Sequence, residues 1–259
     1  MSIKWASTDH FKRFSSASRL CNSLSIYLIK YRMFGEQGLA ANLCSEIVLE
    51  PAVSREGKIH SWAMKHKPKR QSHSSRLTRR VIVSDVTFKR SLLEQQLSFI
   101  DSLPAEMTRD VFVTLNIDDE LADYILDNQD IAEFLLQHRF LRLEIDEAFS
   151  EFHSKSKMIK LRMLSQLSHL WLGGFGGGLT NLTLLERVSF EYIKLDRLFF
   201  LSHFDTHSLY HLCSYASRSS QGIIVDGVDN EEQQQASWAL GAVAASGELW
   251  KPLNYCAGE

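Results

Sequence analysis

The stretch Leu170–Asp196, LWLGGFGGGLTNLTLLERVSFEYIKLD, predicts a strand, a glycine loop, a helix and a second strand in succession. Leu170–Leu172 is a short apolar run that Gly173–Gly178 interrupts, Leu179–Val188 has helical character, and Tyr192–Leu195 is the second apolar run. An apolar strand that leads directly into a glycine loop usually carries its last residues to a ligand site. Here two glycines stand where chemistry would need charged side chains.

The composition limits the class of protein. The chain has 259 residues, 44% of them hydrophobic, and a net charge of −2. One large domain is expected, because a single α/β barrel typically needs about 250 residues, and the charge argues against general binding of polyanions. The four cysteines have no CxxC spacing, which argues against a disulfide framework or a zinc site. No apolar run approaches the roughly 18 residues of a membrane-spanning helix, so a soluble cytoplasmic protein with no membrane contact is expected.

Strand-like and helix-like segments alternate about seven times after Val81. This alternation predicts a parallel sheet with helices on its outer side, and a closed barrel fits it best. A doubly wound open sheet is the alternative, which the absence of a GxGxxG motif after the first strand weakens. The further predicted elements are strands at Val111–Ile117, Leu141–Ile145, Gly222–Val228 and Ala242–Trp250, and helices at Phe88–Leu103, Leu121–Leu135, Met158–Leu167, Thr206–Ser217 and Glu231–Leu240.

The N-terminal part predicts a departure from eight identical units. Ser25–Phe34 and Leu43–Leu49 are strand-like and flank the turn residues Gly35–Gly38, which indicates an initial β-hairpin. The predicted fold is therefore a modified (β/α)8 TIM-like barrel over residues 25–259, preceded by a tail or short helix at residues 1–24. Lys58–Arg80 contains eight Lys or Arg residues and no acid, and it is expected to be a solvated loop. A polyphosphate or nucleic-acid contact is the alternative, and nucleic acid has little support because aromatic residues are sparse there.

Polar residues recur near the ends of the predicted strands, namely Glu46, Asn116, Glu144, Lys194 and Asp226. In a barrel the carboxyl ends of the strands converge on one mouth. Carboxylate and amide oxygens suit Mg²⁺, Mn²⁺ or Ca²⁺, and a lysine suits a phosphate or a bound hydroxide. Each residue taken alone could equally be a salt bridge or a cap at the end of a strand. The repetition in five strands is what points to a metal site that faces a phosphate.

In this order the blocks SEIVLE, TLNID, LRLEIDE, LWLGGFGGG, YIKLDR and IIVDGVDNEEQ resemble the EAL-domain family. That family hydrolyses the second messenger cyclic di-GMP on a modified (β/α)8 barrel with two divalent metals. The resemblance implies that Glu46, in Glu46-Ile47-Val48, is the metal-binding glutamate of the EAL signature and a vestige of the catalytic set. It also implies that Asn116 and Glu144 bind metal, that Lys194 is the active-site lysine, and that Asp226 is the metal-proximal acid. Asp229 would brace the loop after the central strand.

The departures from the family pattern decide the expected function. The family's DDFGTG reads Gly173–Gly178 here, so that Gly173 and Gly174 replace the two metal-binding aspartates. Ser246 stands where the family has a glutamine. No cofactor is expected, and Mg²⁺ or Mn²⁺ would bind only if activity remained, because two-metal hydrolysis needs paired cations to generate its nucleophile. Backbone N–H groups of Gly176 and Gly177, with Lys194 and Ser246, could instead hold a phosphate without metal.

The sequence thus predicts a non-catalytic EAL-like regulator that acts through protein–protein contact in the control of bacterial motility, biofilm or fimbriae. Its expected partner is a regulatory protein, for example a transcription factor, with binding of cyclic di-GMP as a further possibility. Lys58–Arg80 and the surface around Thr206–Ser217 are the candidate contact regions. The alternatives are a cyclic di-GMP phosphodiesterase with an altered metal site and a metal-free receptor of cyclic di-GMP.

Overall fold

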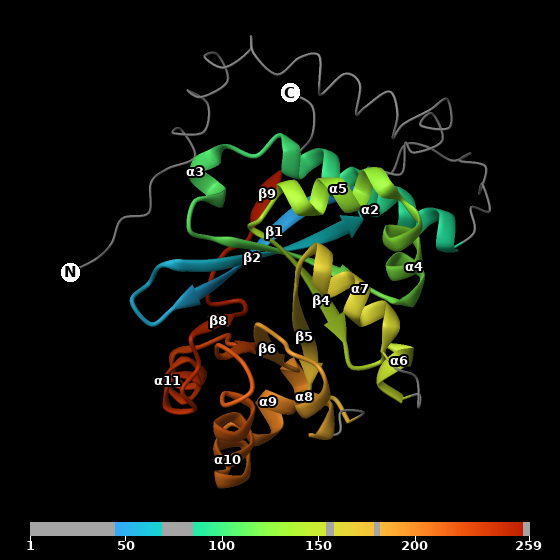
Figure 1. Ribbon diagram of the computed structural model, residues 1–259. Coiled ribbons are helices and arrows are strands. Elements are labelled where there is room, and N and C mark those ends of the chain that lie inside the picture. Colours follow the sequence, from blue (N-terminus) through green and yellow to red (C-terminus); the bar gives the residue numbers. More distant parts are fainter. Residues whose placement is uncertain (1–44, 69–84, 154–157, 179–181, 256–259) are drawn as a thin grey trace, which may run out of the picture. The chain divides into compact units, whose positions relative to one another are not determined.

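The computed structural model describes residues 45–68, 85–153, 158–178 and 182–255, which belong to one compact unit (Figure 1). The predicted tail at residues 1–24 and the predicted strand Ser25–Phe34 lie outside these residues. The boundary that we expect at residue 25 therefore stays a prediction.

Within the described residues, one sheet closes into a barrel, as the sequence predicts. Strands β2 to β8 run parallel in chain order, and β1 closes the barrel by pairing antiparallel with both β2 and β8. The short strand β9 adds to the first half of β1 outside the closed ring. The strands are β1 (Ser45–Ser54), β2 (Ile59–Pro68), β3 (Phe112–Ile117), β4 (Leu141–Asp146), β5 (His169–Phe175), β6 (Tyr192–Leu195), β7 (Ile223–Asp226), β8 (Ala244–Ser246) and β9 (Leu253–Tyr255).

The initial hairpin exists, but its residues differ from those that the sequence suggested. The predicted strand Leu43–Leu49 overlaps β1, which forms a hairpin with β2. The turn between them contains Gly57, which has a positive φ of 77° and donates its N–H to Ser54 O at 2.9 Å. The expected loop Lys58–Arg80 is therefore wrong for its first part, which is β2. Because of its basic residues, β2 resembles a solvated loop in the sequence. In the structure it is hydrogen-bonded to β1 on one side and to β3 on the other.

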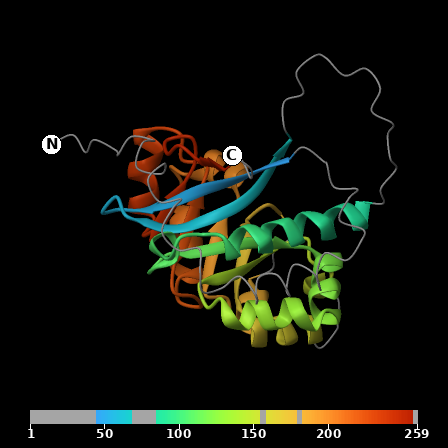
Figure 2. The same ribbon diagram turned by 90° about the horizontal axis from the view of Figure 1, so that it is seen from above.

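Helices cover the outer face of the sheet. Helix α2 runs alongside the hairpin (Figure 2), where Gln96 donates to Met64 O at 3.4 Å and His66 Nε2 lies 3.2 Å from Leu92 O. The helices of the described residues are α2 (Asp85–Asp101), α3 (Ala105–Thr108), α4 (Asp119–Asp127), α5 (Gln129–Gln137), α6 (Ser150–His153), α7 (Ile159–Leu167), α8 (Thr183–Arg187), α9 (Arg197–His203), α10 (His207–Ala216) and α11 (Glu231–Ala239).

The predicted helix Leu121–Leu135 is two helices, α4 and α5, because Asn128 separates them. Asn128 has an extended backbone, and its side-chain oxygen accepts from the N–H groups of Asp130 at 3.1 Å and Ile131 at 3.2 Å. A side chain that satisfies the free donors of a new helix start favours this break. Asp118 caps the start of α4 in the same way, by accepting from Leu121 N at 2.9 Å.

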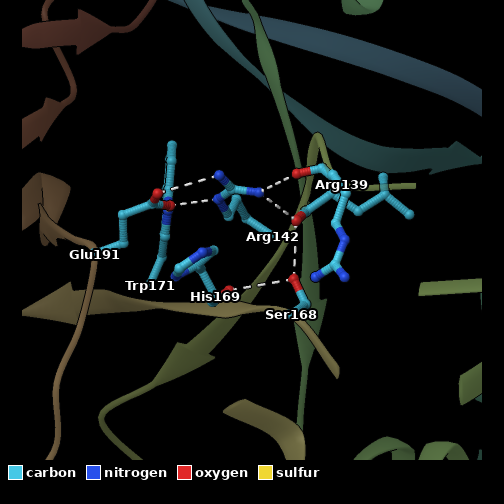
Figure 3. Close-up of polar contacts among 7 residues, drawn as sticks. Arg139, Arg142, Ser168, His169, Trp171 and Glu191 are labelled. Atoms are coloured by element: carbon cyan, nitrogen blue, oxygen red, sulfur yellow. Dashed lines mark hydrogen bonds and ion pairs between the residues drawn. The ribbon is translucent and has the colours of Figure 1, made fainter. Parts of the chain in front are cut away.

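The amino ends of the strands are closed by a buried ion pair, which we call the floor of the barrel (Figure 3). Arg142 of β4 donates through both Nε and Nη2 to the carboxylate of Glu191, the second of these bonds at 3.1 Å. Trp171 Nε1 donates to the same carboxylate at 2.8 Å, and the Arg142 guanidinium lies 4.2 Å from the centre of the Phe112 ring. Since both charges are paired and hydrogen-bonded, their burial is tolerated.

Strand β5 continues further than the sequence suggested. The predicted break begins at Gly173, but β5 extends to Phe175, and Gly173 pairs with Asp146 of β4. The register between β5 and β6 shifts after Leu172, at the two glycines. The loop thus begins only at Gly176, so Gly173 and Gly174 lie inside the sheet, at the end of the strand.

Candidate functional site

The mouth of the barrel brings several of the predicted site residues together. Lys194 Nζ lies 3.6 Å from Glu144 Oε1 and 3.9 Å from Asp226 Oδ2. Ser246 Oγ donates to Asp226 Oδ1 at 3.0 Å, as expected for residues that are in register on β7 and β8. Asn116 pairs with Glu144 in the ladder, and both line a hollow of about 230 Å³ in front of Gly173.

Lys194 is the central charge of this arrangement, and only 9% of it is exposed. Burial alone would lower the pKa of Lys194, because an ammonium loses its hydration shell. The carboxylates of Glu144, Asp226 and Glu50 outweigh this effect and hold the pKa above its usual value. The ammonium is therefore charged at neutral pH and acts as a fixed cation between acids of three strands.

The space at Gly173 and Gly174 is taken by acidic side chains of the neighbouring strand. A Cβ atom on Gly173 would lie 2.8 Å from Glu144 Oε1. A Cβ atom on Gly174, whose φ is +65°, would lie 2.7 Å from Asp146 Oδ2. The absence of two side chains has thus let Glu144 and Asp146 lie against the backbone of β5.

The residues present do not fit the two-metal centre that the family resemblance implies. Glu144 directs Oε1 to Lys194, while its Oε2 is buried and has no hydrogen-bond partner. Glycine offers no side-chain oxygen at positions 173 and 174. Within the ranges that the structure describes, no three His, Cys, Asp or Glu side chains are grouped so that they could hold an ion.

Two further lysines pair with acids near the same rim. Lys65 of β2 lies 2.5 Å from Glu50 Oε2. Lys89 of α2 lies 2.8 Å from Asp118 Oδ2 and 2.9 Å from Glu120 Oε2, and these hydrogen bonds raise the pKa of Lys89. Together with Lys194, these side chains neutralise much of the acidic rim from within the protein.

Below the rim, the interior of the barrel is almost filled. It contains a cavity of about 10 Å³, whose lining residues include Glu50, Thr114, Glu144, Lys194 and Ser246. Thr114 Oγ1 is buried there without a hydrogen-bond partner. A space of this size is close to that of one water molecule, so no nucleotide group could enter the barrel.

Glu46 and Glu50 illustrate what the reversed direction of β1 changes. Glu46 pairs with Lys67 near the start of β1, and its side chain lies outside the described side chains. Glu50 lines the interior cavity and acts on Lys194. Glu50 is not among the site residues predicted from the sequence, because polar residues were expected at the carboxyl ends of parallel strands, whereas β1 is antiparallel.

The glycine loop is held to the end of β4 by Glu147, which is also not among the site residues predicted from the sequence. Glu147 is 3% exposed, and its Oε1 accepts from Gly176 N at 2.6 Å. Gly177 N donates to Gly174 O at 3.0 Å. The two N–H groups predicted to cradle a phosphate are thus already bonded, one of them to a carboxylate. The block LRLEIDE contained the signal, since Asp146 and Glu147 directly follow a buried strand.

Asp229 has other partners than the glycine loop. Arg197 Nη2 donates to Asp229 Oδ2 at 2.6 Å, and Glu248 N donates to Asp229 Oδ1 at 3.0 Å. Asp229 therefore connects the start of α9 to the segment after β8. The loop after β5 is instead held by Glu147, which accepts a hydrogen bond from Gly176 N.

A family model shows to which family this chain belongs. The model of the EAL domain matches residues 84–252, which is well over half of the chain. The chain belongs to the EAL-domain family. The resemblance stated from the residues is confirmed, and the modified barrel agrees with it. None of the helices in the described part of the chain is long and apolar enough to cross a membrane.

Individual relatives are distant. The anti-FlhC(2)FlhD(4) factor YdiV of Salmonella arizonae is 24% identical over 143 residues, which are 54% of this chain and 60% of that protein. This chain therefore matches about three fifths of the length of that relative. The crystal structure of the EAL-like domain protein YdiV has a TM-score of 0.68 at 20% identity, covering 81% of this chain and 92% of the other. The EAL domain of Mycobacterium smegmatis DcpA has a TM-score of 0.62 at 17% identity, with coverages of 81% and 93%.

An enzyme of the family has a similar fold. The phosphodiesterase PaMucR, in a complex with cyclic di-GMP, has a TM-score of 0.60 at 20% identity, covering 87% of this chain and 96% of the other. The overall fold is thus similar both to YdiV, which is named as a factor against FlhC and FlhD, and to PaMucR, which is named as a phosphodiesterase. The residues of the mouth have to distinguish the two functions.

Proposed function

We propose that this protein is a non-catalytic regulator, which uses the EAL barrel as a body for contact with a bacterial transcription factor complex. The pairing of Lys194 with Glu144 and Asp226, beside glycines at positions 173 and 174, is the observation that carries this proposal. The similarity to the factor YdiV supports a complex of the FlhC–FlhD type as the partner. Such a partner would place the protein in the cytoplasm.

The physical argument concerns charge. Hydrolysis of a phosphodiester by two metals needs a water that both cations activate, at ions about 3.5–4 Å apart. Carboxylates must hold those cations, and here they hold ammonium groups instead. A lysine ammonium cannot replace a divalent ion in this role, because it only donates hydrogen bonds and does not coordinate a water and lower its pKa as a metal ion does. We therefore expect no turnover of cyclic di-GMP.

The same charges weigh against a metal-free receptor. A cyclic dinucleotide brings two phosphate charges, and Glu144, Asp146 and Glu147 lie along the side of β4 and its following turn where it would approach. The donors of Gly176 and Gly177 would first have to leave their present acceptors. The cost of breaking these bonds opposes nucleotide binding.

Two measurements on the purified full-length chain test the proposal. Hydrolysis of cyclic di-GMP is assayed with Mg²⁺ and with Mn²⁺, with an active EAL phosphodiesterase as the positive control, and no turnover above the protein-free reaction is expected. Calorimetry with a purified FlhC–FlhD complex is expected to give saturable binding. Metal-dependent turnover would establish the altered phosphodiesterase instead, and metal-free binding of cyclic di-GMP without binding of FlhC–FlhD would establish the receptor.

A further inference from the structure

Two oxygen atoms inside the barrel are buried, and no hydrogen-bond partner lies beside them among the described residues. They are Thr114 Oγ1 and Glu144 Oε2. Thr114 is 2% exposed and Glu144 is 8% exposed. A buried polar atom without a partner is costly, more so when it can carry charge, and native proteins almost always supply one. The two oxygens therefore indicate that a group capable of hydrogen bonding lies between them.

The ammonium group of Lys194 has donors to offer to such a group. Its Nζ lies 3.6 Å from Glu144 Oε1 and 3.9 Å from Asp226 Oδ2. Direct N–H···O hydrogen bonds span about 2.7–3.2 Å, so both distances are too long for a good bond, although only 9% of Lys194 is exposed. A polar contact longer than about 3.5 Å is commonly bridged by a water molecule.

One cavity joins these three side chains. Thr114 of β3, Glu144 of β4 and Lys194 of β6 all line the interior cavity of about 10 Å³. Space remains there because β1 and β2 place the small side chains of Ala52 and Ala63 in its wall. A cavity of about 10–15 Å³ is just large enough for one water, which needs two to four polar partners. The lining meets both requirements.

The opposite wall of the cavity is apolar. Ala52, Trp171 and Ile224 line it and belong to one buried hydrophobic cluster. The indole N–H of Trp171 is already bonded to the Glu191 carboxylate at 2.8 Å. An occupant therefore finds its hydrogen-bond partners only on the polar side, next to Thr114 and Lys194.

The charges around the cavity favour a neutral occupant. A metal ion would lie beside the Lys194 ammonium, and the two positive charges would repel each other. A water molecule can accept a hydrogen bond from Lys194 Nζ and donate one to Glu144 Oε2. It can bond to Thr114 Oγ1 in either direction, because a hydroxyl group both donates and accepts.

We propose that the interior cavity is a binding site for one water molecule, which bridges Lys194 Nζ, Glu144 Oε2 and Thr114 Oγ1. The bridge gives both buried oxygens a partner and connects the lysine of β6 to β3 as well as to β4. The site is independent of the proposed function, since it needs neither a partner protein nor a nucleotide.

A crystal structure of the full-length chain, at a resolution that shows ordered waters, tests the proposal. A single water within about 3.2 Å of all three atoms is expected. Ala63→Val adds two methyl groups at the wall of a cavity that has room for one water, so the water should be lost. Thr114→Ser is the matched control, which keeps the hydroxyl group and should keep the water.

In solution, nuclear Overhauser effects between water and the Ala52 methyl group report on the same site. They are expected in the unchanged protein and in Thr114→Ser, and they should disappear in Ala63→Val. The methyl group of Ala122 is buried but does not line the cavity, so it should show no such effect in any of the three proteins. If Ala63→Val does not fold, the crystal structure of the unchanged protein decides alone.

Three results would overturn the proposal. One is an empty cavity in which Thr114 Oγ1 donates directly to Glu144 Oε2. Another is a crystal structure in which Lys194 Nζ contacts both acids at hydrogen-bond distance and no water is present. The third is a metal ion in the cavity, recognised by oxygen ligands within about 2.6 Å. None of them alters the expected binding of FlhC–FlhD, so the proposed function is tested separately.

Discussion

The two ends of the barrel both contain buried ion pairs, but they are built differently. At the floor, the Arg142 guanidinium donates twice to the Glu191 carboxylate, which also accepts from Trp171. At the mouth, Lys194 lies 3.6 Å and 3.9 Å from its two acids, and Glu144 Oε2 has no hydrogen-bond partner. The floor has the geometry of a stabilising contact, whereas the charges of the mouth lie in a looser arrangement.

This difference shows that two buried ion pairs of one barrel can differ in the geometry that they demand. At the floor, the planar Arg142 guanidinium binds the Glu191 carboxylate through two hydrogen bonds, a geometry that demands particular residues. At the mouth, the flexible side chain of Lys194 lies between two carboxylates without fixed hydrogen-bond angles. Variants at the floor and at the mouth should therefore differ in how strongly they lower the stability of the protein.

The largest effect is expected at the floor. Arg142→Ala should lower the free energy of unfolding by about 3–5 kcal/mol, because it leaves the Glu191 charge buried and unpaired. Urea denaturation followed by circular dichroism measures the change. Arg162→Ala on exposed α7 is the matched control and should change stability by less than about 0.5 kcal/mol. Equal stability of the two variants would show that the floor pair is not structural.

The second prediction concerns the replaced aspartates. Gly173→Asp with Gly174→Asp should fail to create Mn²⁺ binding and should cost about 2–4 kcal/mol of stability, since each new Cβ meets a carboxylate within 2.8 Å and Gly174 has a positive φ. Calorimetry with Mn²⁺ and urea denaturation measure both outcomes. The control is Gly178→Asp, where φ is also positive but nothing lies within 4 Å of a Cβ. Tight Mn²⁺ binding by the double variant would mean that the acids can still rearrange.

The third prediction uses the raised pKa of Lys194. Since its pKa is higher in the folded protein than in the unfolded chain, its contribution is complete below pH 10.5 and is lost as the pH rises through the folded-state pKa. Lys194→Met should cost about 1.5–3 kcal/mol at pH 7. The difference from the unchanged protein should shrink above about pH 10.5, as measured by urea denaturation at several pH values. A difference that is constant with pH would rule out the charged lysine as its source.

The smallest effect is expected in the glycine loop. Glu147→Gln replaces a charge-assisted hydrogen bond to Gly176 N by a neutral one and should cost about 1 kcal/mol. Amide hydrogen exchange of Gly176 should become faster, whereas that of buried β4 amides such as Leu143 should not change. Protection of Gly176 that stays the same would show that Glu147 does not hold the loop.

Much of the fold could be predicted because its signals are local. The apolar runs of β3, β4, β6 and β7 lie close to the predicted segments, since strand period and helix period can be identified within about ten residues. The partner of β1 could not be predicted, because the basic residues of β2 resembled a solvated loop and strand pairing depends on distant chain segments. The break at Asn128 could have been foreseen from its capping preference.

The candidate site divides in the same way. The residues Asn116, Glu144, Lys194 and Asp226 follow from the strand ends, and their roles in metal or nucleotide binding stay predictions. Glu50 and Glu147 needed the structure, because one lies on a reversed strand and the other bonds to a loop 29 residues away. Local patterns identify which side chains lie at the ends of strands, but they do not identify which of these side chains contact one another.

The sequence by itself determined the alternation that makes a barrel and the loss of two carboxylates at positions 173 and 174, because both are properties of residue identity and local spacing. Only the tertiary structure decided that Glu144 and Asp146 occupy the space beside Gly173 and Gly174, and that Lys194 pairs with both Glu144 and Asp226. These features depend on register and packing between segments far apart in the chain, where small differences in space select one pairing of charges over another.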